Sequence, residues 1–194
     1  MSKIIEILND DCLSNAETLF TISDCSETEH GAFLEGISKA TWYPNCDKDD
    51  YEEEEIIAEA KIASILHQDY SPEIIELWLD NHSEDFNRAG ALLCEILDWD
   101  GDKLEEDIRT STTRIIILEE FAVKEKYRNK GLGRYLARKI LYSAGAKGEC
   151  VLIQPALHKE NGNEPERLIK FWLGLDSGMK YSSEFNTMYT CIFN

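Results

Sequence analysis

A strand, a turn with two glycines and a helix follow one another in the second half of the chain, and this order most constrains its fold. Residues 114–123 form a β-branched, apolar run that predicts a strand. Residues 131–146 place apolar side chains on one face of a predicted helix. The turn between them reads Arg128-Asn129-Lys130-Gly131-Leu132-Gly133. Because glycine lets the backbone approach a ligand and helix N-terminal amides point at negative charge, this arrangement predicts a phosphate-binding site.

The residues around this turn are basic. Against one acid, Glu125, the segment from 124 to 139 carries Lys124, Lys126, Arg128, Lys130, Arg134, Arg138 and Lys139. A diphosphate at the turn would meet backbone donors, the helix dipole and this basic rim together. The spacing is not the Rossmann G-x-G-x-x-G, and the lysine-serine pair of a P-loop is absent from the turn.

The remaining elements are predicted with unequal clarity. The second half predicts a strand at Cys150–Gln154, a helix at Glu164–Leu173 and a last strand at Met188–Phe193. The first half predicts a strand at Lys3–Leu8, helical pieces at Cys12–Ile22 and Ala32–Lys39, a helix after Asp50 with apolar positions 56, 60, 63 and 66, and a helix from Ser71 to Leu79. Residues Ala91–Leu97 fit either a helix continued from Ser83 or a strand, and their bracketing by Gly90 and an Asp-Gly turn favours the strand.

Length and composition predict one cytoplasmic domain over residues 1–194. The chain of 194 residues is long enough for one buried core, and no apolar run approaches the roughly 18–20 residues that cross a bilayer. Its start has no secretory pattern, and its six cysteines are scattered without a C-x-x-C pair, which is typical of reduced thiols. The four histidines have no metal-ligand spacing, so we expect no metal.

Charge is distributed unevenly along the chain. Residues 1–120 contain 31 Asp and Glu against 8 Lys and Arg, whereas residues 121–194 contain 7 against 12. A half this acidic repels phosphate backbones, which argues against a nucleic-acid partner, and it attracts cationic molecules. We therefore expect a cationic partner, no membrane contact, and a protein that is compatible with a homodimer.

The turn and its setting resemble the GCN5-related N-acetyltransferase (GNAT) superfamily. Its coenzyme A motif, [Q/R]-x-x-G-x-[G/A] after a strand ending in Val, matches Arg128–Gly133 after Phe121-Ala122-Val123. The resemblance covers residues 114–194. It implies an α/β (α+β) fold whose mixed central sheet is splayed between two middle strands and flanked by helices. Residues 1–113 resemble no family and form a divergent, acidic acceptor-side half.

The resemblance also implies how acetyl-coenzyme A binds. The pantetheine arm would lie in the gap between the strand ending at Val123 and the strand Cys150–Gln154, and the turn amides would hold the pyrophosphate. The implied cofactor-binding residues are Phe121, Ala122, Val123, Arg128, Asn129, Lys130, Gly131, Leu132, Gly133, Arg134 and, before the late helix, Asn163.

Acetyl transfer needs a base, because a free alkylamine has a pKa of roughly 10. Glu119 and Glu120 lie just before the acetyl-binding segment, and Leu118–Val123 is similar to the corresponding segment of polyamine acetyltransferases. In an ideal strand the two glutamates face opposite sides, but the family's bulge in this strand leaves open which one is the base. The late-helix tyrosine that protonates the thiolate in the family is replaced by Phe171 or Trp172, and Tyr181 is a candidate substitute.

Two functions follow as hypotheses. The first is an acetyl-CoA-dependent N-acetyltransferase that moves the acetyl group by direct transfer to the primary amine of a cationic acceptor, either a small molecule or a peptide. The second is a non-catalytic acidic interaction protein on the same scaffold, which the replaced tyrosine and the acidic first half favour.

Overall fold

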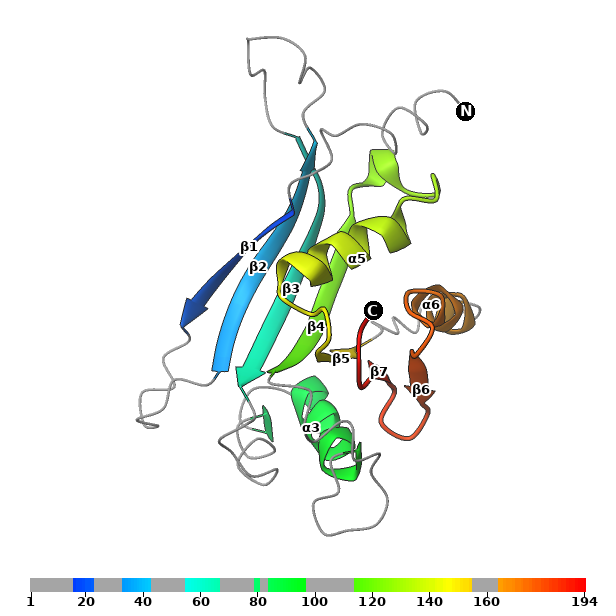
Figure 1. Ribbon diagram of the computed structural model, residues 1–194. Coiled ribbons are helices and arrows are strands. Elements are labelled where there is room, and N and C mark those ends of the chain that lie inside the picture. Colours follow the sequence, from blue (N-terminus) through cyan, green and yellow to red (C-terminus); the bar gives the residue numbers. More distant parts are fainter. Residues whose placement is uncertain are drawn as a thin grey trace.

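The computed structural model describes residues 16–22, 33–42, 55–66, 79–80, 84–96, 114–154 and 164–194. The strands among these residues form one seven-stranded sheet in the order β1-β2-β3-β4-β5-β7-β6 (Figure 1). The strands are β1 (Ala16–Ile22), β2 (Phe33–Trp42), β3 (Glu55–Leu66), β4 (Arg114–Val123), β5 (Cys150–Ile153), β6 (Lys180–Ser182) and β7 (Thr187–Thr190). β4 and β5 run parallel and every other neighbouring pair is antiparallel. The predicted mixed α/β sheet is confirmed.

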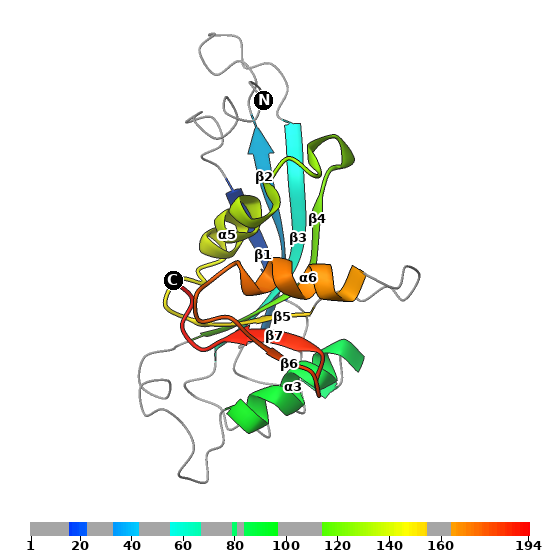
Figure 2. The same cartoon turned by 90° about the vertical axis from the view of Figure 1, so that its right-hand side faces the viewer.

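Helices cover both faces of this sheet (Figure 2). The described helices are α3 (Glu84–Ile96), the short 3-10 helix η2 (Glu125–Tyr127), α5 (Gly133–Ser143) and α6 (Glu164–Leu173). Alternate β4 residues divide between two cores: Ile116 and Leu118 pack with residues of α5 and α6, whereas Ile115 and Ile117 pack with residues of α3. Within the described ranges, none of the helices combines the length and the apolar character that a membrane crossing requires.

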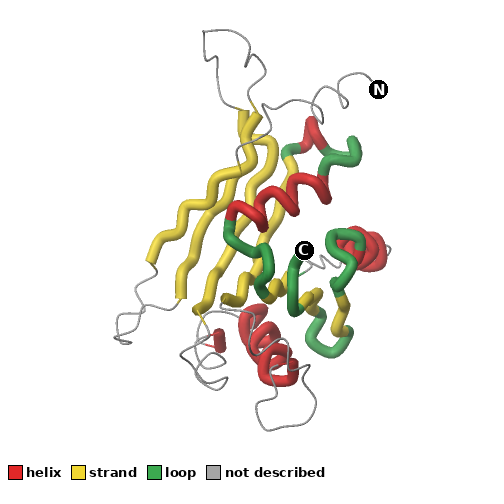
Figure 3. Tube along the Cα trace, viewed as in Figure 1, coloured by secondary structure: helices red, strands yellow, loops and turns green. Residues whose placement is uncertain are grey.

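Two helical predictions for the first half are wrong where the structure describes them. Residues 16–22 of the predicted helix Cys12–Ile22 form β1, and the predicted helix Ala32–Lys39 lies largely within β2; Figure 3 draws both as strands. β2 buries Ser38 and Ala40 and exposes Ile37 and Lys39, so the exposed apolar Ile37 and the buried polar Ser38 hide the period of two.

The helix predicted after Asp50 is also wrong, because Glu55–Leu66 is the central strand β3. β3 pairs with β2 on one side and β4 on the other, and it contributes to both cores. Ala60 and Ile62 face one core and Ala63 and Ile65 face the other, so apolar residues occupy both parities. A strand buried on both faces has no alternation, and its apolar positions matched helical spacing by coincidence.

The strand preferred for Ala91–Leu97 is wrong as far as Ile96, where α3 ends. Phe86, Ala89 and Leu93 are buried against the sheet at helical spacing, and this covers one of its faces. The helix continued from the preceding residues, which was the other alternative, is therefore correct. The predictions for Lys3–Leu8 and for most of Ser71–Leu79 lie outside the described residues.

The predictions for the second half are confirmed. β4 and α6 have the predicted bounds, and α5 and β5 lie within theirs. The predicted last strand Met188–Phe193 extends too far, because β7 ends at Thr190. Thr190 Oγ1 donates a hydrogen bond to the Ile192 carbonyl at 3.0 Å, so the chain bends there and leaves the ladder.

Candidate functional site

A β-bulge interrupts β4 at Glu119. Along β3, Lys61 is paired with Glu120 and the next residue, Ile62, is paired with Leu118, which leaves Glu119 as the extra residue. The burial of β4 agrees: Leu118 and Phe121, three residues apart, both pack in the core against α5 and α6. The bulge therefore reverses the alternation of side chains at the point where the sequence places its two glutamates.

The edge of β4 beyond this bulge is open toward β5. The β4–β5 ladder runs from Ile115 and Cys150 to Leu118 and Ile153, and Gln154 adds a last hydrogen bond to the Leu118 carbonyl at 3.2 Å. In the described part of the chain, the stretch from Glu119 to Val123 has a partner strand only on its β3 side. This is the gap between the middle strands that the sequence predicted.

The turn after β4 places two residues in the left-handed backbone region, Asn129 at φ 59° and Gly131 at φ 78°. A Cβ added to Gly131 would meet no atom within 4 Å, so the backbone here borders open space. α5 begins two residues later, and among the described side chains none caps its N-terminus and no acid lies in its first turn. Its first amides therefore have no side-chain acceptor among the described residues and can bind an anion.

Aromatic rings connect the turn to the open edge of β4. A Cβ added to Gly133 would lie 2.9 Å from Phe171, so α5 and α6 approach closely at this glycine. The Phe171 ring contacts Trp172 edge-on at 4.7 Å, and Trp172 contacts Phe121 of β4 at 5.7 Å. Trp172 is buried, and either it or Phe171 stands where the resemblance implies a tyrosine. The end of β4, the start of α5 and the C-terminal part of α6 thus form one packed unit.

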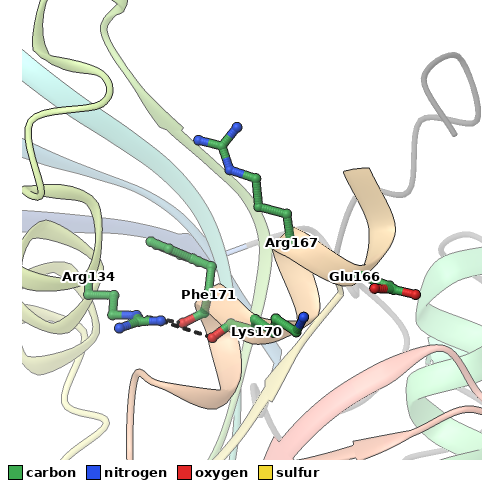
Figure 4. A pocket seen from close by; sticks show the side chains of 5 residues that line it. All are labelled: Arg134, Glu166, Arg167, Lys170 and Phe171. Carbon is green, nitrogen blue, oxygen red and sulfur yellow. Dashed lines mark hydrogen bonds between the residues drawn. The ribbon is translucent and has the colours of Figure 1, made fainter. Parts of the chain in front are cut away.

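An open pocket of about 510 Å³ lies between α5 and α6 (Figure 4). It is lined by Arg134, Glu166, Arg167, Lys170 and Phe171. Three of these five side chains are cationic, and the aromatic one offers an apolar surface. The part of the pocket lining that comes from α6 was not predicted, although positions 167, 170 and 171 have the spacing of a single helix face.

Much of the predicted basic rim is bound by the protein itself. Arg134 donates to the carbonyls of Lys170 and Phe171, both at 2.9 Å, and so holds the C-terminus of α6 (Figure 4). Arg128 donates to the Val123 carbonyl at 2.7 Å, and Arg138 donates to the backbone oxygen of Asn194 at 2.6 Å. These three guanidinium groups are therefore held by backbone oxygens of the protein.

The three rim lysines that lie before or within the turn divide into two groups. Lys124 forms an ion pair with Glu59 at 3.5 Å, and Lys126 pairs with Glu55. Lys130 instead lies over the Tyr127 ring at 5.4 Å, next to the turn. From α6, Arg167 donates to the Asn129 side chain at 3.1 Å and reaches the same turn. Lys130 and Arg167 therefore each contact a residue in or directly before the turn.

The two candidate bases have different surroundings. Glu120 is exposed, and its Oε1 lies 2.6 Å from Lys61 Nζ. Glu119 is half-buried in the bulge, at the start of the open edge. Lys61 also interacts electrostatically with Glu119 and Glu35, and Glu120, which contributes most, raises the pKa of Lys61. The structure thus distinguishes the exposed Glu120, which pairs with Lys61, from the half-buried Glu119, which lies in the bulge.

Tyr181 is placed away from this edge. It lies on β6, in the cross-strand row Tyr181, Met188, Ile153 and Leu118, and three strand spacings of about 4.8 Å separate it from β4. Its hydroxyl donates to Asn186 at 2.9 Å. Asn163, the other predicted contact, lies outside the described residues. Among the described residues, no group of His, Cys, Asp and Glu side chains could hold a metal ion.

Comparison with known proteins agrees with this geometry. A model described as the Acetyltransferase (GNAT) family matches residues 37–167, which is more than half of the chain. The match includes β3, the bulged β4, the glycine turn, α5 and β5, so the family likeness begins well before residue 114, where the sequence motif alone placed it. Among curated proteins no significant match is found. The chain therefore belongs to the GNAT family of acetyl-CoA-dependent N-acetyltransferases.

Proposed function

We propose that this enzyme transfers an acetyl group from acetyl-CoA directly to the primary amine of a cationic acceptor, with Glu119 as the general base. The observation that carries the proposal is the juxtaposition of the bulge at Glu119, the open edge of β4 and the uncapped N-terminus of α5. A thioester held along that edge by its pantetheine arm and at α5 by its pyrophosphate would have its carbonyl beside the bulge.

The residues present fit coenzyme A. The open backbone at Gly131 and the first amides of α5 suit a pyrophosphate, with Lys130 and Arg167 beside them. The edge of β4 offers backbone groups to the amides of the pantetheine arm. The pocket lined by Lys170 and Phe171 offers a cation and an aromatic face to the phosphorylated nucleoside.

The chemistry requires one proton to leave the acceptor before attack. Glu119, directly or through a water, would accept a proton from the ammonium and give it to solvent. The amine nitrogen then attacks the thioester carbonyl carbon, the C–N bond forms, and the C–S bond breaks to release the thiolate. The thiolate takes its proton from the acylated nitrogen. This route needs no tyrosine acid, which is consistent with Trp172 in the late helix and with Tyr181 bonded to Asn186.

Charge supports a cationic acceptor, with polyamines and basic peptides as the first compounds to test. Glu120 and Glu35 belong to the sheet face opposite α5 and lie around Lys61, next to the bulge. Across the first 120 residues, acidic residues exceed basic ones by 31 to 8. Such a field raises the local concentration of cations and accelerates their association.

The test measures free thiol release from acetyl-CoA with a panel of cationic, neutral and acidic amines. We expect turnover with the cationic amines, and a fall of at least roughly 100-fold in kcat for Glu119→Gln. Calorimetry should give the same coenzyme A affinity for this variant as for the wild type, because the carboxylate does not hold the cofactor.

Glu120→Gln is the matched control, since it removes the neighbouring carboxylate and leaves the bulge residue in place. It should retain kcat within about fivefold, as a group outside the proton path would. Turnover only with neutral or acidic amines would contradict the cationic acceptor. Coenzyme A binding without any turnover would favour the non-catalytic interaction protein instead.

A further inference from the structure

Tyr127 lies directly before the glycine turn and is only 4% exposed. It ends the short helix η2, and its neighbour Arg128 opens the turn. Its hydroxyl donates a 2.7 Å hydrogen bond to Oε2 of Glu55, at the start of β3 and 72 residues earlier in the chain. A long-range contact of this kind fixes the turn to the central sheet independently of β4.

Glu55 carries its charge in this contact. Hydrogen bonds from Lys126 and then from Tyr127 hold the pKa of the Glu55 carboxyl below its ordinary value of 4.5, while burial raises the pKa of Tyr127. At neutral pH the hydroxyl is therefore protonated and the carboxylate ionised. The bond between them is charge-assisted, which makes it stronger than a bond between neutral groups.

The ring of Tyr127 supports the basic residues on either side of it. Lys126 Nζ lies 5.0 Å and Lys130 Nζ 5.4 Å from the ring centroid. Lys126 also pairs with Glu55 Oε1, so the carboxylate uses one oxygen for each of its two partners. Lys130 has no such ion pair among the described contacts, and it lies inside the turn. The ring thus places the Lys130 ammonium beside the phosphate-binding backbone.

We propose that Glu55 is a positioning residue for the cofactor: through Tyr127 it fixes the turn 128–133 and the Lys130 ammonium in their binding geometry. The proposal rests on the proposed function, because that function assigns the cofactor to this turn. Glu55 does not touch the cofactor in this role. It reduces the conformational freedom that the turn would otherwise lose when the diphosphate binds.

Glu55 also has an opposing effect, and this makes the variants informative. Its carboxylate holds Lys126, whose ammonium would otherwise add to the positive field at the turn. Glu55→Gln keeps an acceptor for Tyr127 and releases Lys126, whereas Glu55→Ala loses the acceptor as well. Tyr127→Phe keeps the ring beneath Lys130 and removes only the hydroxyl donor. The three substitutions therefore separate anchoring from charge.

The experiment measures coenzyme A affinity by calorimetry, together with kcat and KM for acetyl-CoA. We expect Tyr127→Phe and Glu55→Ala to raise Kd and KM by about 3- to 10-fold with kcat within about twofold. Glu55→Gln should have a smaller effect than Glu55→Ala. Hydrogen exchange of the free protein should be faster in residues 128–135 of Tyr127→Phe and unchanged in α6.

Glu59→Gln is the matched control, because Glu59 lies on the same strand and its ion pair within the described part of the chain is with Lys124 of the same segment. It should leave Kd within about twofold, as expected for an exposed ion pair. Failure of the wild type to bind coenzyme A would overturn the proposed function and this inference with it. Wild-type binding with equal Kd and equal exchange in Tyr127→Phe would overturn the inference alone.

Discussion

Lys61 Nζ lies 2.6 Å from Glu120 Oε1 across the β3–β4 ladder, one residue beyond the bulge at Glu119. Both side chains of the pair are more than half exposed, so the pair itself adds little stability. The pair gives the two adjacent glutamates different surroundings. Glu120 pairs with Lys61 across the ladder, and Glu119 lies in the bulge at the open edge. Neighbouring carboxylates with different surroundings can have different roles.

Replacing Lys61 by Met should shift the acidic limb of the kcat/KM profile to higher pH by a few tenths of a unit. The sign follows from the removal of a positive charge near Glu119, which makes the ionised form of that carboxylate less favourable. The plateau at high pH should stay within about threefold of the wild type, because the pair does not take part in proton transfer.

Lys39→Met is a control with the same change of charge, since Lys39 is an exposed residue of β2 that lies one strand further from β4. The acidic limb of the kcat/KM profile should move less in Lys39→Met than in Lys61→Met. A plateau that falls about 100-fold in Lys61→Met would mean instead that the ion pair participates in the chemistry.

Gly133→Ala should weaken coenzyme A binding about 10-fold with little change in stability. The new Cβ would lie 2.9 Å from the Phe171 ring, which lines the pocket and can move into it. Overpacking costs about 1–3 kcal/mol, but alanine in a helix gains up to roughly 1 kcal/mol over glycine, and movement of the ring relieves part of the rest. Calorimetry and urea unfolding measure the two effects separately.

Gly131→Ala should lower the stability of the protein more than it weakens coenzyme A binding. Here the added Cβ meets no atom, but φ of 78° is unfavourable for alanine and costs about 1–2 kcal/mol of stability. Measured against the Phe171→Leu single variant, Gly133→Ala should cause no further loss of binding, and the stability loss of Gly131→Ala should be unchanged by Phe171→Leu. Equal behaviour of the two double variants would show that the Phe171 contact is not the cause.

Arg134→Met should lower the free energy of unfolding by about 1 kcal/mol, because two 2.9 Å hydrogen bonds to the last carbonyls of α6 are lost at an exposed site. Arg134→Lys should recover only part of this, since an ammonium lacks the forked geometry. Lys139→Met is the control within α5, because Lys139 lies over the Tyr135 ring instead of reaching α6. Urea unfolding of the three variants ranks them, and equal values for Arg134→Met and Lys139→Met would contradict the assigned role.

The second half of the fold could be predicted because its signals are local. The buried Leu136 and Ile140 of α5 and Ala144 at its C-cap keep a helical period, and four consecutive buried residues identify β5 as a strand. The glycine turn between β4 and α5 has a backbone requirement that the sequence states directly, and the φ of Gly131 meets it. Each of these elements follows from a single short segment.

The first half could not be predicted because its structure depends on partners far away in sequence. β3 is a strand because β2 and β4 flank it and helices cover both faces, and its own pattern states none of this. The resemblance implied a bulge in β4, but its place at Glu119 depends on how β4 pairs with Lys61 and Ile62. The role of Glu55 is of the same kind, since its partners Lys126 and Tyr127 come from a distant segment. The sequence around Glu55 predicted only that this residue lies near the start of a helix after Asp50.

The anchor at Glu55 should make stability depend on pH in a defined direction. Its folded pKa is lowered, first by the hydrogen bond from Lys126 and then by that from Tyr127. A lowered pKa means that the contribution is fully present above the ordinary value of 4.5 and is lost as pH falls through the folded pKa. The difference in unfolding free energy between the wild type and Glu55→Gln should therefore be constant at neutral pH and shrink below 4.5. In the Tyr127→Phe background one of the two hydrogen bonds is absent, so the same difference should be smaller and should fade at higher pH. Urea unfolding followed by tryptophan fluorescence over a pH series measures both curves, and a difference that grows as pH falls would show that Glu55 is not stabilised in its ionised form.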